Sequence, residues 1–248
     1  MLDNKILVML PTYNERENVE IMCKKIAALG IPIDILFVDD NSPDGTGILL
    51  KQLAEKTPQI YIIERPGKLG IGSAHIDGIR WAYSHKYSYL VTMDCDFTHS
   101  PDNIPVLLKY TKEFDVIVGS RHLLEDSLNG WNFGRKFLTL AGHFLTTNLL
   151  NMPYDATGAF RLYRIDRIPS EVFDLVSSKG YAFFFESLAI LNLKRFRIKE
   201  IPIMLPPRTY GHSKMKLRDM IQCLVIMFKM SFFIRFKKQK YSARINRQ

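Results

Sequence analysis

The sequence contains few cysteines and no recognisable export signal. Its three cysteines, Cys23, Cys95 and Cys223, are odd in number and widely spaced, which excludes a disulfide framework and fits a reducing compartment. The first ten residues, MLDNKILVML, contain no long apolar run followed by a cleavage site, so we expect no secretory signal. The six histidines form no cluster with metal-ligand spacing. The chain also lacks the GxxxxGK[ST] spacing, which excludes a phosphate-loop ATPase.

The composition is that of an ordinary globular protein with a basic tail. The chain has 248 residues, of which 47% are hydrophobic and 24% charged, enough to bury a large core. The net charge of +9 is concentrated at the end of the chain, where six basic residues stand with no acid: Arg235, Lys237, Lys238, Lys240, Arg244 and Arg247. Without these six, 28 basic residues face 25 acidic ones. The excess charge therefore belongs to the tail and not to the folded body.

The first half of the chain alternates short apolar runs with amphipathic segments. This alternation predicts strands over 5–10, 33–38, 60–63, 89–93 and 115–118, with helices over 18–29, 46–56, 73–85 and 102–112. Buried strands separated by helices favour an α/β fold, a doubly wound and mostly parallel sheet with helices on both faces. In such sheets ligands bind at the carboxyl ends of the strands.

We expect one domain over residues 1–216 and an appendage over 217–248. The segment 217–236 is apolar apart from a polar side that carries Arg218, Gln222 and Lys229, so it predicts an amphipathic helix. Lys229 and Arg235 make it a poor membrane span, whereas an interfacial helix with a basic flank suits anionic head groups. The alternative is a helix packed on the domain's own core with a solvated tail. The tail has one aromatic residue and no recognition module, so we expect no nucleic-acid partner.

Carboxylates follow two of the predicted strands. Asp94 and Asp96 come directly after the apolar run 89–93, where both can turn towards one point, and such oxygen ligands suit Mg²⁺ or Mn²⁺. Asp40 follows the strand over 33–38, where a carboxylate can accept hydrogen bonds from a base or ribose. The alternative in both places is ordinary turn and capping chemistry. A glycine-bearing basic loop over 65–74 precedes a predicted helix, whose amide groups would attract phosphate.

Several motifs in order resemble one family. ILVMLPTYNERENVE, ILFVDDNSPDGTG, RPGKLGIGSAHIDGI, VTMDCDFTHSP and VIVGSRH resemble family 2 glycosyltransferases of the GT-A fold. The later stretches DATGAFRLY and RTYGHSK are similar to dolichyl-phosphate (polyprenol monophosphate) mannosyltransferases within that family. The resemblance covers roughly residues 5–230, and an ordered set of motifs is more specific than any single one.

The resemblance implies a role for each matching residue. Around the donor nucleotide it implies five residues: Pro11, Tyr13, Glu15, Val38 and Asp40. Asp94, the backbone of Cys95, and Asp96 would bind the donor diphosphate and a Mg²⁺ or Mn²⁺ ion.

Three cations complete the implied site. Arg121 would approach the phosphates, and Arg208 and Lys214 would form a clamp over the donor diphosphate or the acceptor phosphate. Arginine binds phosphate in a bidentate manner and lysine adds a point charge, so this assignment is chemically sensible. The alternative is a surface loop with two ordinary charges.

The sequence departs from the family pattern at two positions. Thr98 stands where some members have a glutamine that contacts the metal. Leu140 stands where some members have an arginine. Either that phosphate contact is lost, or one of three nearby residues supplies it: Arg135, Lys136 or His143.

The implied reaction is inverting transfer of mannose from GDP-mannose to a dolichyl or polyprenyl monophosphate. The acceptor phosphate is already an anion at neutral pH, so the reaction requires no general base. We expect a peripheral enzyme on the cytoplasmic face of a membrane, with a small membrane-anchoring subunit as a possible partner. The alternatives are a family 2 transferase that uses a UDP-sugar, with a polyprenyl phosphate or a saccharide acceptor, and a non-catalytic nucleotide-sugar-binding partner. Intact Asp94, Asp96, Arg208 and Lys214 argue against the non-catalytic protein.

Two further features favour structural roles. Glu186 is expected to lie on a helix and to satisfy a buried arginine. The aromatic run 181–185 favours core packing over a groove for a lipid tail.

Overall fold

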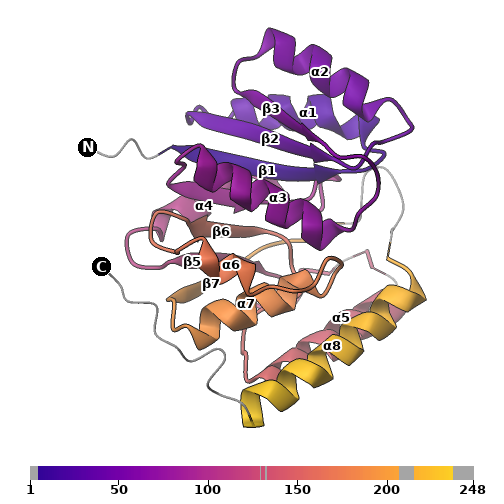
Figure 1. Cartoon of the computed structure of the whole chain (residues 1–248), viewed down its shortest axis with the longest axis vertical. Helices are drawn as coiled ribbons and strands as arrows, with labels where there is room; N and C mark the ends of the chain where they lie inside the picture. The colour runs from indigo at the N-terminus through magenta and orange to yellow at the C-terminus, as the bar shows by residue number, and fades with distance from the viewer. Residues whose placement is uncertain (1–4, 129, 132, 207–214, 237–248) are drawn as a thin grey trace.

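The computed structural model describes residues 5–128, 130–131, 133–206 and 215–236 (Figure 1). Within these residues one sheet is covered by helices. Its elements, in chain order, are β1 (Ile6–Thr12), α1 (Arg16–Ala27), β2 (Ile33–Asp39), α2 (Thr46–Lys56), β3 (Ile60–Glu64), α3 (Ile71–Ser84), β4 (Tyr89–Thr92), η1 (Pro101–Asn103), α4 (Ile104–Lys109), β5 (Val116–Ser120), α5 (Phe133–Leu150), β6 (Arg161–Arg164), α6 (Glu171–Asp174), α7 (Phe183–Leu193), β7 (Ile198–Pro202) and α8 (Leu217–Phe236).

The seven strands form a mixed and mostly parallel sheet in the order β3-β2-β1-β4-β6-β5-β7. β6 alone runs antiparallel to its neighbours β4 and β5, whereas the other neighbouring pairs are parallel. The chain winds outward from β1 through β2 to β3 and then returns to place β4 on the other side of β1. This reversal creates a crevice at the carboxyl ends of β1 and β4, the usual ligand position in open α/β sheets.

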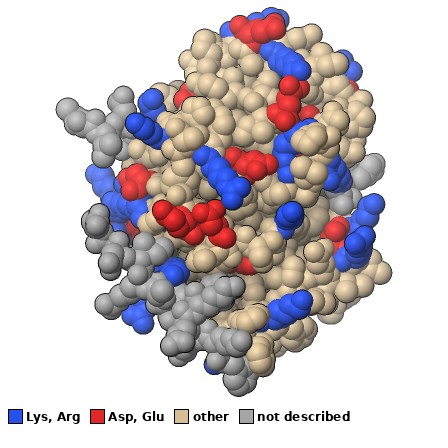
Figure 2. Space-filling model, in the orientation of Figure 1, with Lys and Arg blue, Asp and Glu red and all other residues tan. Residues whose placement is uncertain are grey.

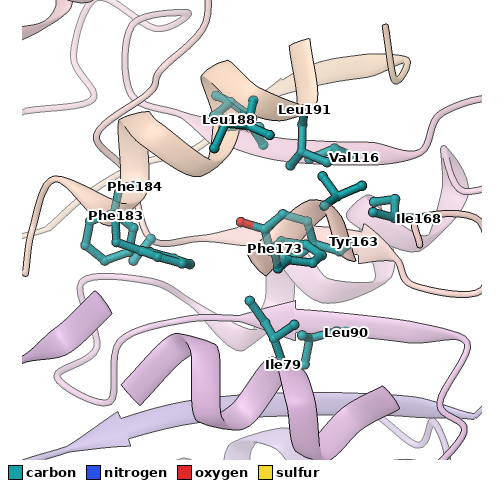
Figure 3. Packing of buried hydrophobic residues seen from close by; sticks show 14 of the residues in the cluster. Ile79, Leu90, Val116, Tyr163, Ile168, Phe173, Phe183, Phe184, Leu188 and Leu191 are labelled. Carbon is teal, nitrogen blue, oxygen red and sulfur yellow. The ribbon is translucent and has the colours of Figure 1, made fainter. Parts of the chain in front are cut away.

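Alternate side chains of the strands enter two cores, one on each face of the sheet. In β1, Leu7 and Met9 join one core, whereas Val8 and Leu10 join the other. Helices α3, α6 and α7 cover the first face, and α1, α2 and α4 supply apolar residues to the second. Figure 3 shows the first core, in which Ile79 of α3 and Leu188 of α7 approach the sheet from their two helices. Strands buried on both faces are continuous apolar runs in the sequence, and for this reason the sequence pattern predicts them correctly.

The structure confirms the α/β class and most of the predicted elements. The helix over 46–56 has the bounds of α2, and the strands in the first half of the chain differ from their predicted bounds by at most two residues at either end. The helix expected over 102–112 is shorter, because a 3-10 turn led by Pro101 precedes α4 and the helix ends at Lys109. Pro105 occupies the first turn of α4, where its missing N–H group disrupts no helical hydrogen bond.

Helix α8 has the bounds predicted for the amphipathic helix, residues 217–236, and it packs along α5 (Figure 1). Met227 and Met230 of α8 are buried in the first core, so the helix does contact the domain. Other large apolar side chains of α8 and α5 remain exposed to solvent. Among the described helices, none combines the length and apolarity that a bilayer span requires. The division of the chain at residue 216 stays a prediction.

Candidate active site

A pocket opens at the carboxyl ends of β1, β2 and β4. Eight of the residues predicted for the site line it: Pro11, Tyr13, Glu15, Asp40, Asp94, Cys95, Asp96 and Arg121. They are distant in sequence and meet because parallel strands end at the same edge of the sheet. Val38 is fully buried in the first core. Arg208 and Lys214 lie outside the described residues.

The three loops that form this edge each contain a residue with a left-handed backbone. Asn14, after β1, has φ 57°; Asn41, after β2, has φ 55°; and Phe97, after β4, has φ 62°. Asparagine tolerates this region, but for phenylalanine it costs about 1–2 kcal/mol. Such strain persists where the surrounding structure holds the chain in place, and it is concentrated at functional sites.

Hydrogen bonds position the two carboxylates that the sequence predicts for a metal. Asp96 is buried, and its Oδ1 accepts the backbone N–H of Thr98 at 3.1 Å and the Thr98 hydroxyl at 2.6 Å. The Asp94 side chain is 30% exposed, and its Oδ2 lies 3.8 Å from Nδ1 of His99. That nitrogen accepts the backbone N–H of Asp94 at 3.1 Å, which places the ring proton on Nε2 in a neutral imidazole. One carboxylate is therefore held inside the wall and the other faces the pocket.

These carboxylates fit a hard divalent cation. No group of three or more metal-ligating side chains occurs among the described residues. Mg²⁺ and Mn²⁺ sites for phosphate chemistry need no such cage, because one or two carboxylates suffice when water and phosphate oxygens complete the shell. Cys95 lies between the two aspartates in the sequence. Burial raises the pKa of its thiol, so this side chain stays protonated. The Asp-Cys-Asp segment thus offers oxygen ligands and no thiolate.

Asp40 is tied to the basic loop that follows β3. Arg65 forms an ion pair with Oδ1 of Asp40, and both side chains are buried. The same guanidinium donates to the Ser73 hydroxyl at 2.5 Å, so it joins the end of β2 to the start of α3. Burial raises the pKa of the Asp40 carboxyl, and the attraction of Arg65 opposes this effect. In the same loop, Nζ of Lys68 lies 4.5 Å from the centre of the Tyr13 ring, a cation–π contact inside the pocket.

Arg121 is held by Asp155, the first residue of the DATGAFR stretch. Nε of Arg121 lies 2.7 Å from Oδ2 and its second guanidinium nitrogen lies 3.2 Å from Oδ1, a bidentate pair. Burial alone would raise the pKa of Asp155, but the charge and hydrogen bonds of Arg121 outweigh it and lower the pKa to about 2. Gly158 lies against the same guanidinium, because a Cβ there would stand 3.0 Å from it. The pair thus fixes a cation in the pocket wall.

The sequence pattern did not mark Trp131 or Leu205 for the pocket, and it favoured a core role for the run that contains Tyr181 and Phe184. Tyr181, Phe184 and Leu205 line the pocket, and so does Trp131, whose indole N–H donates to the Leu205 carbonyl at 3.0 Å. These residues come from the second half of the chain, where no strand–loop pattern marks them. Only tertiary folding brings them to the site. The aromatic run 181–185 accordingly serves mainly the core, since Phe183, Phe184 and Phe185 are all buried.

The structure gives the departures from the family pattern a physical setting. The Thr98 hydroxyl is engaged by Asp96, so this residue positions a carboxylate. His143 of α5 stacks on His122 with ring centres 3.9 Å apart, and His122 follows Arg121 in sequence. Burial is the main cause that lowers the pKa of His122 to about 4, although Asp155 opposes it. Both imidazoles therefore lie behind the arginine side of the pocket.

The prediction for Glu186 is wrong. This residue lies on α7 as expected, but its carboxylate accepts hydrogen bonds from the backbone N–H groups of Ser177 and Ser178, at 3.0 and 2.8 Å, and from the Ser177 hydroxyl. It thus caps the segment before α7 and forms no ion pair with an arginine of the described residues.

Comparison with known proteins assigns this architecture to a family. The model of the family described as "Glycosyl transferase family 2" matches residues 7–173. The chain belongs to glycosyl transferase family 2. It is therefore a glycosyltransferase, and the predicted family is confirmed. Relatives include an undecaprenyl-phosphate mannosyltransferase of Micrococcus luteus, 34% identical over 85% of this chain and 87% of the relative. A polyprenol monophosphomannose synthase of Mycolicibacterium smegmatis is 34% identical over 85% of this chain and 81% of the relative.

Solved structures of two other proteins share the fold. Residues 1–349 of S. aureus TarS in complex with UDP-GlcNAc align with a TM-score of 0.60 and 14% identity, over 96% of this chain and 70% of that one. The mannosyltransferase PcManGT of Pyrobaculum calidifontis, in complex with GDP-Man and Mn²⁺, aligns with a TM-score of 0.50 and 15% identity, over 96% and 72%. At this identity the likeness concerns the fold alone, and it confirms the GT-A type of α/β domain.

Proposed function

We propose that this glycosyltransferase transfers mannose from GDP-mannose to a polyprenyl monophosphate of the dolichyl type and inverts the anomeric centre. The observation that carries the proposal is the 34% identity, over most of the chain, to two enzymes named for polyprenyl-phosphate mannosyl transfer. The pocket is chemically consistent with this reaction, because it combines carboxylates for a metal with cations for phosphate.

The donor would lie across the carboxyl ends of β1, β2 and β4. Tyr13 and Asp40 offer a stacking face and a hydrogen-bond acceptor to the nucleoside, and Pro11 and Glu15 lie in the same wall. A Mg²⁺ or Mn²⁺ ion held by Asp94 and Asp96 would neutralise charge on the leaving diphosphate. PcManGT carries GDP-Man and Mn²⁺ on the same fold, which supports both assignments.

The acceptor phosphate would act as the nucleophile without a general base. Its second pKa is about 6, so it carries a reactive anionic oxygen at neutral pH. The chain must then bring two anions together, and cations are needed for this. Arg121 faces the pocket in a fixed orientation, held by Asp155. Arg208 and Lys214 would supply the remaining positive charge, on the resemblance alone.

The lipid acceptor requires access to a membrane, and the layer of α5 and α8 suits such contact. Phe137 and Phe144 of α5 are 61% and 66% exposed, and Phe228 and Phe232 of α8 are 58% and 56% exposed. In Figure 2 the surface over these helices, at the lower right, is largely uncharged with scattered basic groups. An apolar surface with basic residues near it favours peripheral attachment to anionic lipid. We place the enzyme on the cytoplasmic face of that membrane.

A transfer assay tests the reaction directly. Purified protein would receive radiolabelled GDP-mannose or a UDP-sugar, together with dolichyl phosphate or a shorter polyprenyl phosphate and Mg²⁺ or Mn²⁺. We expect organic-phase label from GDP-mannose alone, lost when EDTA removes the metal. Label from a UDP-sugar alone would overturn the donor. Intact nucleotide binding without transfer would instead indicate a missing membrane subunit or a non-catalytic protein, and addition of a membrane extract would separate these two cases.

A further inference from the structure

Arg161, the first residue of β6, carries a charge in the interior of the protein. Its side chain is 0% exposed and is among the largest of the fully buried ones. Guanidinium groups remain protonated in proteins, so this side chain is a buried cation at any pH of interest. Burying a charge is unfavourable unless another group compensates it.

The hydrogen-bond partners of Arg161 are all neutral. Its two terminal nitrogens donate to the carbonyls of Ala156 and Phe184, each at 2.8 Å, and to the hydroxyls of Ser187 and Tyr163, at 3.2 and 3.4 Å. Its Nε is buried with no hydrogen-bond partner in the described part of the chain. Figure 3 shows the Tyr163 hydroxyl on the side of its ring that faces Phe184.

Three other arginines of the described chain, with side chains 3% to 11% exposed, have carboxylate partners. Arg65 pairs with Asp40, Arg121 with Asp155, and Arg164, at the far end of the same strand, with Asp166. No ion pair within the described residues includes Arg161. Glu186, the nearby acid on α7, is occupied by the serines that precede that helix.

Both carbonyls that bind Arg161 belong to segments that form the pocket. Ala156 immediately precedes Thr157, Gly158 and Ala159, which line it, and Phe184 lines it directly. The guanidinium therefore lies behind the pocket wall and holds two parts of that wall together. His75 packs edge-on against the same Phe184 ring, and burial, aided by the charge of Arg161, lowers its pKa to about 4. His75 is thus neutral at pH 7 and adds no second cation beside Arg161.

We propose that Arg161 is a positioning residue whose charge, which no ion pair of the described residues neutralises, favours polyphosphate in the pocket. The charge attracts the phosphates of the bound nucleotide through the part of the wall that residues 157–159 and Phe184 form. This inference rests on the proposed function only in taking a nucleoside diphosphate as the ligand. It differs from the roles of Asp94, Asp96 and Arg121, because Arg161 does not touch the ligand.

Equilibrium binding of three ligands that differ only in charge tests the inference. Guanosine, GMP and GDP would be titrated calorimetrically, with Mg²⁺ present, into the full-length wild type, Arg161→Gln and Arg161→Lys. The matched control is Arg164→Gln, which removes a buried arginine from the same strand far from the pocket. Circular dichroism and thermal unfolding would verify that each variant folds.

If the charge acts on phosphate, the loss in Arg161→Gln grows with ligand charge. We expect guanosine to bind within about two-fold of wild type and GDP at least about ten-fold more weakly. Burial lowers the pKa of a lysine at this position, so Arg161→Lys carries the charge best at low pH, and at pH 6 it is expected to retain GDP affinity within about three-fold. Arg164→Gln should leave all three affinities unchanged.

Two results would overturn the inference while the proposed function stands. One is an equal loss of affinity for all three ligands in Arg161→Gln, which indicates that the arginine only joins two segments of the pocket wall through its hydrogen bonds. The other is a folded Arg161→Lys that loses its preference for GDP over guanosine at pH 6 as well as at pH 8, which decides the matter even if the glutamine variant does not fold. If the wild type binds uridine, UMP and UDP instead, the same variants are compared with those three ligands, and the same two results overturn the inference. A wild type that binds neither series overturns the proposed function together with this inference.

Discussion

The polar edge of the sheet and the layer of α5 and α8 solve opposite problems of burial. At the edge, charged groups are buried and each is held by a partner, as in Arg65 with Asp40 and Arg121 with Asp155. In the layer, large apolar groups such as Phe144 and Phe228 are left in water. Under the proposed function, phosphate would bind at the edge and lipid would cover the layer.

The comparison also separates rigid parts from surface parts. At the edge, directional hydrogen bonds and residues with a left-handed backbone hold the side chains in one arrangement. Single substitutions there should therefore reduce the transfer rate strongly. The layer depends on non-directional contact, so single substitutions there should act in smaller, additive steps. Variants in both regions test whether the edge is more sensitive to substitution than the layer, and we take them in order of decreasing expected effect.

Loss of a metal-site carboxylate should have the largest effect. Asp94→Asn and Asp96→Asn are each expected to lower kcat by about 10³-fold or more, because an amide cannot supply the charge that the metal requires. Label transfer into the organic phase measures this loss. Asp174→Asn, on an exposed ion pair with Arg80, is the matched control and should retain full activity. A folded Asp94→Asn enzyme with the wild-type rate would refute the metal assignment.

Removal of the Asp155 carboxylate should leave Arg121 buried without a partner. Asp155→Asn is expected to lower the free energy of unfolding by about 3–5 kcal/mol and to reduce transfer as well. Urea denaturation at pH 7 measures the first effect. Asp166→Asn, which removes the more exposed partner of Arg164, should cost about 1 kcal/mol or less.

The same pair sets a pH dependence with a defined sign. The pKa of Asp155 is lowered from 3.8 to about 2 in the folded protein, so its contribution is fully present above pH 3.8. That contribution is lost as the pH falls through about 2. The stability difference between wild type and Asp155→Asn should therefore shrink by about 2 kcal/mol between pH 5 and pH 2. A difference that stays constant over this range would show that the carboxylate charge is not what stabilises the pair.

Charge placed on the apolar layer should weaken lipid attachment and spare nucleotide binding. Phe228→Glu is expected to reduce partition onto anionic vesicles by about ten-fold or more, since burial of a phenylalanine contributes about 1.5–3 kcal/mol. Co-sedimentation with the vesicles measures it. The control is Ile48→Glu on α2, which removes an equally exposed apolar residue far from the layer. Equal losses in both variants would mean that the layer has no special role.

Removal of the Thr98 hydroxyl should have the smallest effect. Thr98→Val deletes the 2.6 Å hydrogen bond to Asp96 and leaves the backbone bond intact, so kcat should fall by about three- to ten-fold. Thr98→Ser retains the hydroxyl and should behave as wild type. Should Thr98→Val match Asp96→Asn in its loss, Thr98 itself would have to contact the metal or the donor.

The doubly wound half of the fold, and the edge of the sheet where the site lies, could be predicted from local sequence pattern. Its strands are buried on both faces and read as continuous apolar runs, each followed by polar residues such as Asp40 and Asp94. Local pattern is sufficient there, because in parallel sheets every carboxyl end reaches the same edge. The bounds of α8 were legible for a similar reason, since its apolar stretch ends in charged residues.

The partners of these residues could not be predicted from the sequence, because they depend on the folded chain. The antiparallel insertion of β6 between β4 and β5, and with it the neutral surroundings of Arg161, depends on pairing between segments far apart in the chain. The same holds for Asp155 beneath Arg121, and for Glu186, which binds serine amides and not the arginine expected of it. Periodicity reports which side chains are buried. It does not report which polar groups meet there, because hydrogen-bond geometry is set by the folded backbone.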